Sequence, residues 1–456
     1  MKKLFGTDGI RGVANEYPIT AEMAVCIGRA VATFFGGKGS SPKIIIGKDT
    51  RLSGDMLESA MVAGICSAGA DACVAGVLPT PAIAHLTSSL KASAGIMISA
   101  SHNPYYDNGI KVFKGDGYKL TDEQEVEIEK LILNDTSGAR LKDSHKMGTA
   151  HNIEKSKSDY ISFLKNAVLA GVFFKGLKIV LDCSHGATYR VAPQLFADLG
   201  AEVESLAVQP NGININDGCG SQHTEGLIKA VRAKRADLGL AFDGDGDRLI
   251  AVDETGEILT GDHILAICAK AMKQKGALKN NLVVSTVMSN MGFGIALKKM
   301  GIVHEITQVG DRYVIQRMIA TGAVLGGEDS GHIIFSSHHT TGDGILTALK
   351  LIEAVQIENQ RLSNLSKIMT VYPQILVNID VKTKPDIKDV PEIMDAIQSV
   401  EAELADNGRV LVRYSGTQPL CRVMVEGPDE TSTRRYCNQI ADIIMNNIGI
   451  NCKNAE

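Results

Sequence analysis

Three carboxylates stand at alternate positions in one short segment, Asp243, Asp245 and Asp247, between two apolar runs. In an extended strand the outer two would lie about 13 Å apart, too far for one ion whose ligands sit at roughly 2.1 Å. The chain must therefore curl, and the intervening Gly244 and Gly246 permit the curl. Carboxylate oxygens without a Cys or His ligand favour Mg²⁺ over zinc. The segment predicts a magnesium loop, with a solvated acidic turn as the structural alternative.

The same spacing resembles an EF-hand calcium loop, in which Asp243 and Glu254 would take positions 1 and 12. The EF-hand fails because Arg248 stands at position 6, where the sharp turn requires Gly, and because the flanks have the pattern of strands rather than helices. Arg248 could hold a phosphate beside the metal, or serve only as a counter-ion to the acids.

A serine lies in the segment Ser101-His-Asn-Pro104, directly after an apolar run. Pro104 disfavours helix and favours a turn that projects polar side chains. A Ser–His hydrolase is disfavoured because adjacent side chains seldom face each other and the chain has no Gly-x-Ser-x-Gly elbow. A turn serine bonded to its own backbone is the structural alternative. Ten residues on, Lys111 could neutralise a phosphoryl oxygen or assist proton transfer, unless it is solvated surface.

The loop Gly326-Gly-Glu-Asp-Ser-Gly-His332 places an acid, a hydroxyl and an imidazole between glycines. This combination suits recognition of sugar hydroxyls by Glu328 and Ser330 and general acid–base work by His332 near neutral pH. A purely structural histidine is the alternative for His332.

Another polar loop, Arg413-Tyr-Ser-Gly-Thr-Gln418, separates two β-like runs near the end of the chain. It supplies a guanidinium, two hydroxyls and a flexible backbone, which together would cradle a phosphate monoester. The alternative is a polar hairpin turn without a ligand.

Three stretches share one order of parts that would position these loops: a β-rich run, a helical pattern, a second apolar run, and a third that ends in polar sequence. The third runs are Ala94–Ser101, Ala236–Asp243 and Gly322–Glu328. Alternating strands and helices predict largely parallel sheets, whose ligands bind beyond the carboxyl ends of strands. The serine, metal and sugar loops then hold equivalent positions in three related α/β domains, although any α/β chain shows some such alternation.

After about residue 368 the pattern changes to the β-like runs Gln374–Asp380, Arg409–Arg413 and Cys421–Val425, with helical stretches between and after them. This pattern predicts a smaller C-terminal α+β domain. We therefore expect four domains, at residues 1–150 with the serine loop, 151–252 with the metal loop, 253–367 with the sugar loop, and 368–456 with the phosphate loop.

The composition limits the partners of the chain. Its 456 residues, 44% of them hydrophobic, are enough for several cores. A net charge of -5 with interspersed signs gives no broad basic face, so we expect no nucleic-acid or membrane partner. The nine scattered cysteines indicate reduced thiols, and no run of eighteen apolar residues or leader-like start occurs. These features predict a cytoplasmic protein.

Together the four loops resemble those of the α-D-phosphohexomutase superfamily, in the same order along the chain. Three further segments are similar to its bacterial members that act on glucosamine phosphates: Phe5–Gly12, Asn211–Asn216 with Cys219–Ser221, and Thr340–Ile345. The similarity extends over essentially the whole chain. It implies a heart-shaped fold of three related α/β domains and a small C-terminal domain around a central cleft.

The resemblance also implies a role for each loop. Ser101 would be a phosphoserine, one of whose oxygens joins the three aspartates around one Mg²⁺. Residues expected to contact the sugar or its distal phosphate are His102, Glu328, Ser330, Arg413, Ser415, Gly416, Thr417 and Arg422. Arg11, Lys111 and Arg248 would surround the transferring phosphoryl group, and either His332 or Lys111 would manage the proton of the attacking hydroxyl.

Three positions depart from the superfamily pattern: Asp329 in place of Gln, Tyr414 in place of Lys, and Gln418 in place of Glu. None removes a charge at the metal or the serine, but the last two weaken the expected attraction for the distal phosphate.

The implied reaction converts glucosamine 6-phosphate to glucosamine 1-phosphate through a 1,6-bisphosphate of glucosamine or glucose, which also activates the enzyme. A mutase for neutral hexose phosphates and a non-catalytic phosphosugar-binding protein are the rivals, and a homodimer is an open expectation.

Overall fold

Three of the four β-sheets repeat one strand order. We describe a computed structural model that covers residues 4–6, 8–36, 41–134, 144–415 and 419–450. The orders β5-β4-β2-β3, β10-β9-β7-β8 and β15-β14-β12-β13 correspond strand for strand. In each, the last three strands are parallel and the first is antiparallel to its neighbour. The predicted threefold repeat is therefore confirmed at the level of topology.

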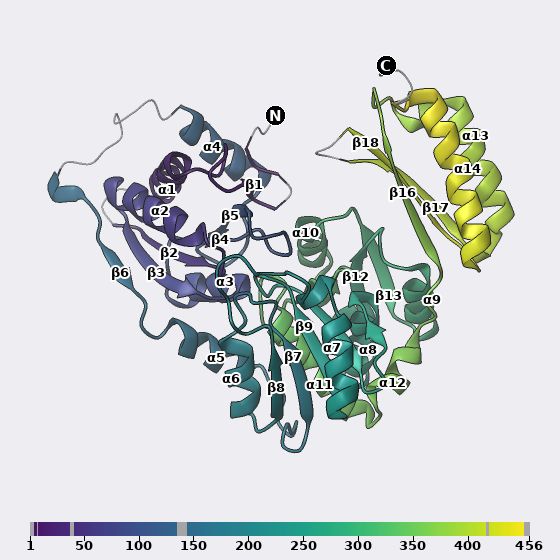
Figure 1. The fold of residues 1–456 in the computed structure, drawn as a ribbon, viewed down its shortest axis with the longest axis horizontal. Helices are drawn as coiled ribbons and strands as arrows, with labels where there is room; N and C mark the ends of the chain where they lie inside the picture. Colours follow the sequence, from purple (N-terminus) through teal and green to yellow (C-terminus); the bar gives the residue numbers. More distant parts are fainter. Residues whose placement is uncertain (1–3, 7, 37–40, 135–143, 416–418, 451–456) are drawn as a thin grey trace. The chain divides into compact units, whose positions relative to one another are not determined.

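The first sheet adds an edge strand on each side, giving the order β1-β5-β4-β2-β3-β6. Helices α1, α2 and α4 lie on one face and α3 on the other (Figure 1). Thr20 caps α1 and a Thr121–Gln124 capping box starts α4. The elements are β1 Ile10–Val13, α1 Ala21–Phe35, β2 Lys43–Lys48, α2 Gly54–Ser67, β3 Asp71–Val77, α3 Thr80–Ser89, β4 Ala94–Ile98, β5 Asp107–Lys114, α4 Asp122–Leu133 and β6 Ala150–Asn152.

The second and third sheets have their helices inserted between parallel strands, as α/β order requires. The second contains α5 Ser156–Asn166, β7 Lys178–Asp182, α6 Val191–Asp198, β8 Glu202–Leu206, α7 Glu225–Lys234, β9 Leu238–Phe242, β10 Leu249–Asp253 and β11 Ile258–Leu259. The third contains α8 Gly261–Gln274, β12 Leu282–Thr286, β13 Val303–Thr307, α10 Asp311–Thr321, β14 Leu325–Gly327, β15 Ile333–Phe335, α11 Gly344–Glu358 and α12 Leu362–Leu365.

The fourth sheet is antiparallel, with the order β16-β18-β17. Its elements are β16 Gln374–Asp380, α13 Pro391–Leu404, β17 Arg409–Tyr414, β18 Leu420–Glu426 and α14 Glu430–Ile448. The connection from β12 to β13 contains α9 Met291–Lys299, which groups with this sheet in one compact unit. Helices α13 and α14 bury their apolar faces on one side of the sheet. The smaller C-terminal α+β fold is thus confirmed.

The chain divides into two compact units. One comprises Met1–Met288 with Gly301–Ile368 and holds the first three sheets; the other comprises Ser289–Met300 with Met369–Glu456 and holds the fourth. The strands that lead into the serine and metal loops end shortly before them: β4 ends at Ile98 and β9 at Phe242. Ladder pairing stops where the chain turns into the antiparallel strand that follows. None of the helices in the described ranges has the length and apolar character needed to cross a bilayer.

Candidate active site

Ser101 lies in the loop that joins β4 to antiparallel β5, and only 1% of its surface is exposed. Its Oγ donates to Asp243 Oδ2 at 2.6 Å and lies 3.3 Å from His102 Nδ1. The backbone φ of 54° is left-handed, a conformation that costs an L-residue about 1–2 kcal/mol. The hydroxyl is therefore held away from solvent and directed at the carboxylates of the second sheet.

The three acids form the equivalent β9–β10 connection. Each offers a carboxylate oxygen that lies within 4.8 Å of those of the other two, and all three side chains are buried. Gly246 makes the turn with a φ of 71°. Asp245 Oδ1 and Asp247 Oδ1 are buried and have no hydrogen-bond partner in the part of the chain that the structure describes, which would be costly unless a cation satisfied them. This all-oxygen donor set fits Mg²⁺.

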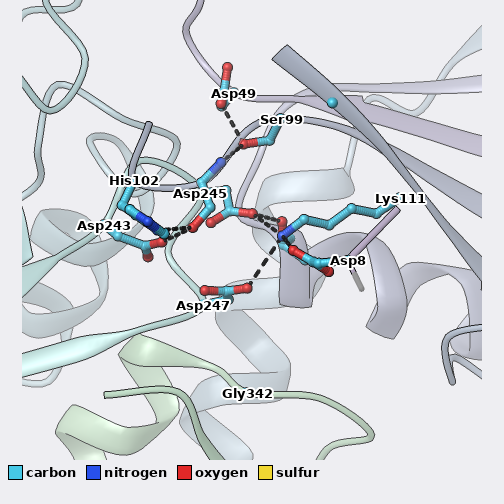
Figure 2. A network of polar contacts seen from close by, with 12 residues as sticks. Asp8, Asp49, Ser99, His102, Lys111, Asp243, Asp245, Asp247 and Gly342 are labelled. Atoms are coloured by element: carbon cyan, nitrogen blue, oxygen red, sulfur yellow. Dashed lines mark hydrogen bonds and ion pairs between the residues drawn. The ribbon is translucent and has the colours of Figure 1, made fainter. Parts of the chain in front are cut away.

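Lys111, on β5, projects into the acid cluster (Figure 2). Its Nζ donates to Asp245 at 2.8 Å and lies 3.5 Å from Asp247 and 3.1 Å from Asp8. Asp8 is shared further: Arg11 donates to its Oδ2 at 2.5 Å, and Lys119 to its Oδ1 at 2.6 Å. One carboxylate therefore holds three cations together beside the acids.

The carboxyl groups have opposing pKa shifts. Burial, with repulsion from Asp247 and Asp245, raises the pKa of Asp243 well above its usual value. Burial also opposes ionisation of Asp247, but Lys111 and His332 overcome it and hold the pKa of Asp247 well below normal. Lys111 shows the converse: despite burial, the neighbouring carboxylates raise its pKa well above 10.5. The site contains both a carboxyl that resists ionisation and a lysine that stays charged.

Arg248, a further cation, and the imidazole of His102 complete this side of the site. The Arg248 Nε lies 3.7 Å from Asp247 Oδ1 and has no hydrogen-bond partner among the described residues. Burial, together with the charges of Arg248 and Arg11, lowers the pKa of His102 to about 4. His102 is thus neutral at pH 7 and able to hydrogen-bond without adding charge.

The sugar loop is the third equivalent connection, between β14 and β15. His332 sits between two acids, with Nδ1 3.6 Å from Asp247 and Nε2 3.8 Å from Asp311. Burial lowers its pKa, but Asp247 and Asp311 raise it above 6.5 overall. The Gly342 N–H donates to Nε2 at 3.1 Å, and a Cβ at residue 342 would lie 2.6 Å from the ring. Glycine is therefore required beside the imidazole.

The two expected sugar contacts have different surroundings. Glu328 Oε1 accepts a bond from Gly310 N at 3.0 Å. Ser330 Oγ is buried without a partner among the described residues, so its hydroxyl can be used by a ligand. Asp329 points elsewhere: its Oδ1 accepts from Asp262 N at 3.3 Å, at the start of α8. Asp329, which stands where the superfamily pattern has Gln, therefore stabilises the N-terminus of α8.

The phosphate loop belongs to the second compact unit. Arg413 and Arg422 are directly opposite on β17 and β18, and burial together with repulsion from Arg422 lowers the pKa of Arg413. Such a like-charge pair is costly without an anion between its members. Lys384 donates to the carbonyl of buried Ser415 at 2.7 Å. Gly416 and Thr417, with Gln418, lie outside the described residues.

Tyr414 explains one of the sequence departures. It pairs with Cys421 and packs with the apolar core under the sheet, on the face opposite Arg413. Residue 414 therefore faces the core and not the arginine pair.

Several residues of the site were missed from the sequence: Asp8, Asp49, Arg51, Ser99, Lys119, Asn216, Asp311 and Gly342. Three of them, Asp8, Asn216 and Gly342, stand inside the segments Phe5–Gly12, Asn211–Asn216 and Thr340–Ile345 that had been singled out without a role. Their membership of those segments was the available signal.

Comparisons with known proteins identify the family. Four models of phosphoglucomutase/phosphomannomutase match in order: α/β/α domain I at residues 2–139, domain II at 158–256, domain III at 260–372 and the C-terminal domain at 376–443. A phosphoglucosamine mutase of Syntrophus aciditrophicus is 58% identical over 98% of this chain and 100% of its own, and one of Syntrophobacter fumaroxidans is 57% identical over the same shares.

The chain belongs to the phosphoglucosamine mutase family. Membership makes it an isomerase, an intramolecular phosphotransferase of amino-sugar metabolism. Its fold matches a phosphoglucomutase/phosphomannomutase family protein of Burkholderia thailandensis with a TM-score of 0.80 at 23% identity, covering 98% of this chain and 99% of the other. It also matches an Aspergillus fumigatus N-acetylphosphoglucosamine mutase in complex with GlcNAc-6P and magnesium, with a TM-score of 0.69 at 17% identity, covering 97% and 96%.

Proposed function

We propose that this mutase interconverts glucosamine 6-phosphate and glucosamine 1-phosphate, with Ser101 as the phosphoryl carrier. The observation that carries the proposal is the convergence, within one compact unit, of a buried serine hydroxyl, three carboxylates and a lysine. Phospho-Ser101 gives its phosphoryl group to the free hydroxyl of the sugar phosphate, forming a 1,6-bisphosphate of glucosamine. The serine then regains the other phosphoryl group, so the serine is phosphorylated again at the end of the cycle. A 1,6-bisphosphate of glucosamine or glucose also serves as activator.

Asp243, Asp245 and Asp247 would hold one Mg²⁺, which when bound supplies positive charge to the transferring phosphoryl oxygens. The chain's own cations serve the same end. Arg11 and Lys111, held together by Asp8, and Arg248 beside Asp247 bind the phosphoryl oxygens. Stabilising spread negative charge is the main requirement of phosphoryl transfer.

We assign the proton of the attacking hydroxyl to His332 rather than Lys111. Lys111 is bonded to Asp245 and its pKa lies well above 10.5, so it does not accept a proton near pH 7. Burial lowers the pKa of His332, but Asp247 and Asp311 raise it above 6.5 overall, and an imidazole is the side chain that most often acts as a general acid or base near neutral pH. His102, Glu328 and Ser330 orient the sugar beside it.

The distal phosphate of the substrate is proposed to bind in the second unit, between Arg413 and Arg422. Their juxtaposition supports an anion there, as does the buried Nε of Arg422, which has no hydrogen-bond partner among the residues that the structure describes. Ser415, Gly416 and Thr417 are proposed to add donors to the same phosphate.

A coupled assay on purified protein, comparing the phosphates of glucosamine, glucose and mannose, tests the substrate. Glucosamine phosphate should be preferred; preference for a neutral hexose would assign the chain to a different mutase. Ser101→Ala should lose turnover, and its intact mass should lack one phosphoryl group. Ser158→Ala, at an exposed position of α5, should lose neither. Unchanged turnover in Ser101→Ala would rule out the carrier mechanism, and an inactive wild-type protein would favour a phosphosugar-binding role.

The remaining proposals concern the chain as a whole. We propose the domain limits 1–150, 151–252, 253–367 and 368–456, a cytoplasmic location, and a homodimer. Light scattering on the eluted protein tests the dimer, and a monomeric mass at working concentration would reject it.

A further inference from the structure

Arg51 follows β2, and none of its side-chain surface is exposed. A guanidinium has five N–H donors, and here each meets an oxygen. Nε donates to Asp49 at 2.9 Å. The two terminal nitrogens donate to four carbonyls of the serine loop, those of Ser101 at 2.9 Å, Asn103 at 2.8 Å, Asp107 at 3.0 Å, and Pro104. Because no donor is left over, Arg51 cannot bind a phosphate without releasing the loop.

Asn216, from a loop of the second sheet, reaches two of the same carbonyls. Its Nδ2 donates to the carbonyl oxygens of Ser101 at 2.9 Å and Asn103 at 3.0 Å. Its own backbone is left-handed, with a φ of 61°, and is fixed by a bond from its N–H to Ser184 O at 2.9 Å. Two side chains from different sheets therefore converge on one short piece of backbone.

The backbone at Ser101 needs such support. Its left-handed φ is unfavourable for serine, so contacts outside the residue must maintain it. The Ser101 N–H donates to Ser99 Oγ at 2.9 Å, and Ser99 donates in turn to Asp49 at 2.5 Å. Figure 2 shows Asp49 beside Ser99. Asp49 anchors both Ser99 and Arg51, so the amide and the carbonyl of Ser101 are held through one buried carboxylate.

We propose that Arg51 and Asn216 are positioning residues for phosphoryl transfer, which act by holding the carbonyls of Ser101 and Asn103 so that the serine Oγ stays aimed at Asp243. The inference rests on the proposed carrier role of Ser101. Among the described residues, neither side chain bonds to Asp243, Asp245, Asp247 or the serine hydroxyl, so their effect passes through the backbone of the loop. A displacement of about 1 Å at the reacting atom costs on the order of 100-fold in rate.

The test uses Arg51→Lys and Asn216→Gly in the full-length enzyme. Lysine keeps the charge but has only three donors on one nitrogen, and glycine keeps the left-handed backbone while removing both amide donors. Arg409→Lys is the matched control, because Arg409 also bonds a carboxylate, Glu426, and a carbonyl, Ser289, in the other unit. The experiment measures steady-state kcat and KM, and single-turnover transfer from phosphoserine. It also measures the ³¹P resonance of the phosphoserine and the melting temperature.

Arg51→Lys should lower kcat and single-turnover transfer about 100-fold, and Asn216→Gly about 10-fold, with KM within about threefold of wild type. The ³¹P resonance should shift or broaden in both, while Arg409→Lys changes only stability. Equal kcat in Asn216→Gly and wild type, or a loss explained wholly by melting temperature, would overturn the positioning role even if Arg51→Lys fails to fold. If wild type itself carries no phosphate on Ser101 and shows no turnover, the proposed function has failed instead.

Discussion

The ammonium of Lys111 lies 2.8 Å from a carboxylate oxygen of Asp245, although the two residues are 134 positions apart in the chain. The contact joins the first sheet to the second at the point where the metal loop turns. A buried lysine therefore offsets part of the negative charge that the three acids concentrate.

Replacing Lys111 should separate metal affinity from turnover. In Lys111→Gln the acid cluster loses a positive charge that repels a divalent cation, so affinity for Mg²⁺ should rise about tenfold. Turnover should fall by at least about 100-fold because the cation that we propose binds the phosphoryl group is lost. Calorimetric titration and the coupled assay measure the two effects. Lys114→Gln, which removes a surface pair with Asp116, is the control and should change neither. Weaker Mg²⁺ binding in Lys111→Gln would contradict the repulsion argument.

Asp8 should matter more than a surface carboxylate because it holds Arg11, Lys111 and Lys119 together. Asp8→Asn leaves these cations mutually repelling, and we expect kcat to fall about 100-fold and the free energy of unfolding by about 3 kcal/mol. Kinetics and urea denaturation followed by circular dichroism measure the two quantities. Asp198→Asn, which removes a surface bond to Lys165, should be nearly silent. Wild-type kcat in Asp8→Asn would show that the three cations do not depend on it.

Gly244 should tolerate no side chain. A Cβ there would lie 2.5 Å from Ser101 O and 2.8 Å from Asn216 Nδ2, so Gly244→Ala must push the metal loop and the serine loop apart. We expect a loss of turnover of at least about 100-fold. Gly226→Ala in α7 meets no atom within 4 Å and should keep full activity with slightly higher stability. An active Gly244→Ala would mean that the two loops can separate without harm to the reaction.

Asp343 should make stability depend on pH. Burial raises its pKa to about 6, from 3.8, even though Leu346 N and Tyr160 donate to it. The folded state therefore favours the neutral carboxyl, a contribution that is fully present below pH 3.8 and is lost as pH rises through about 6. The stability of wild type relative to Asp343→Asn should fall by about 2 kcal/mol between pH 4 and 7.

Urea denaturation of both proteins across this pH range measures the difference. Asp429 caps α14 with a similar bond but is exposed, and the bond from Ser432 lowers its pKa. The stability of wild type relative to Asp429→Asn should therefore not fall as the pH rises from 4 to 7. A pH-independent difference for Asp343→Asn would show that its carboxyl ionises normally in the folded protein.

The sequence predicted the partners of Ser101 because they follow from a repeat. Ser101 and the three acids end corresponding strands, and loops at corresponding ends were expected to carry ligands. It did not predict Arg51, because the donors of that residue go to backbone carbonyls, which every sequence contains. Asp8 was missed because its importance lies in being shared by three cations distant in the chain.

The antiparallel pairing of the strand after each functional loop was not predicted either. Runs such as Leu249–Asp253 have the same apolar pattern in parallel and antiparallel pairing, since both faces are buried. The tight connection from β9 to β10 excludes a parallel crossover, and that constraint is visible only once the acid loop is known to be a hairpin.

The bond from Ser101 to Asp243 spans 142 residues and has a consequence for how the protein is made. A ribosome completes the first sheet, including the serine, long before it reaches the acid loop. A nascent chain that ends before Asp243 has the serine hydroxyl but lacks the three carboxylates. Its second sheet is also unfinished, so Asn216 is not yet held where it contacts the serine loop. The proposed competence of Ser101 to carry phosphate would therefore be acquired late in synthesis, and fragments released early would be unable to take part in the cycle.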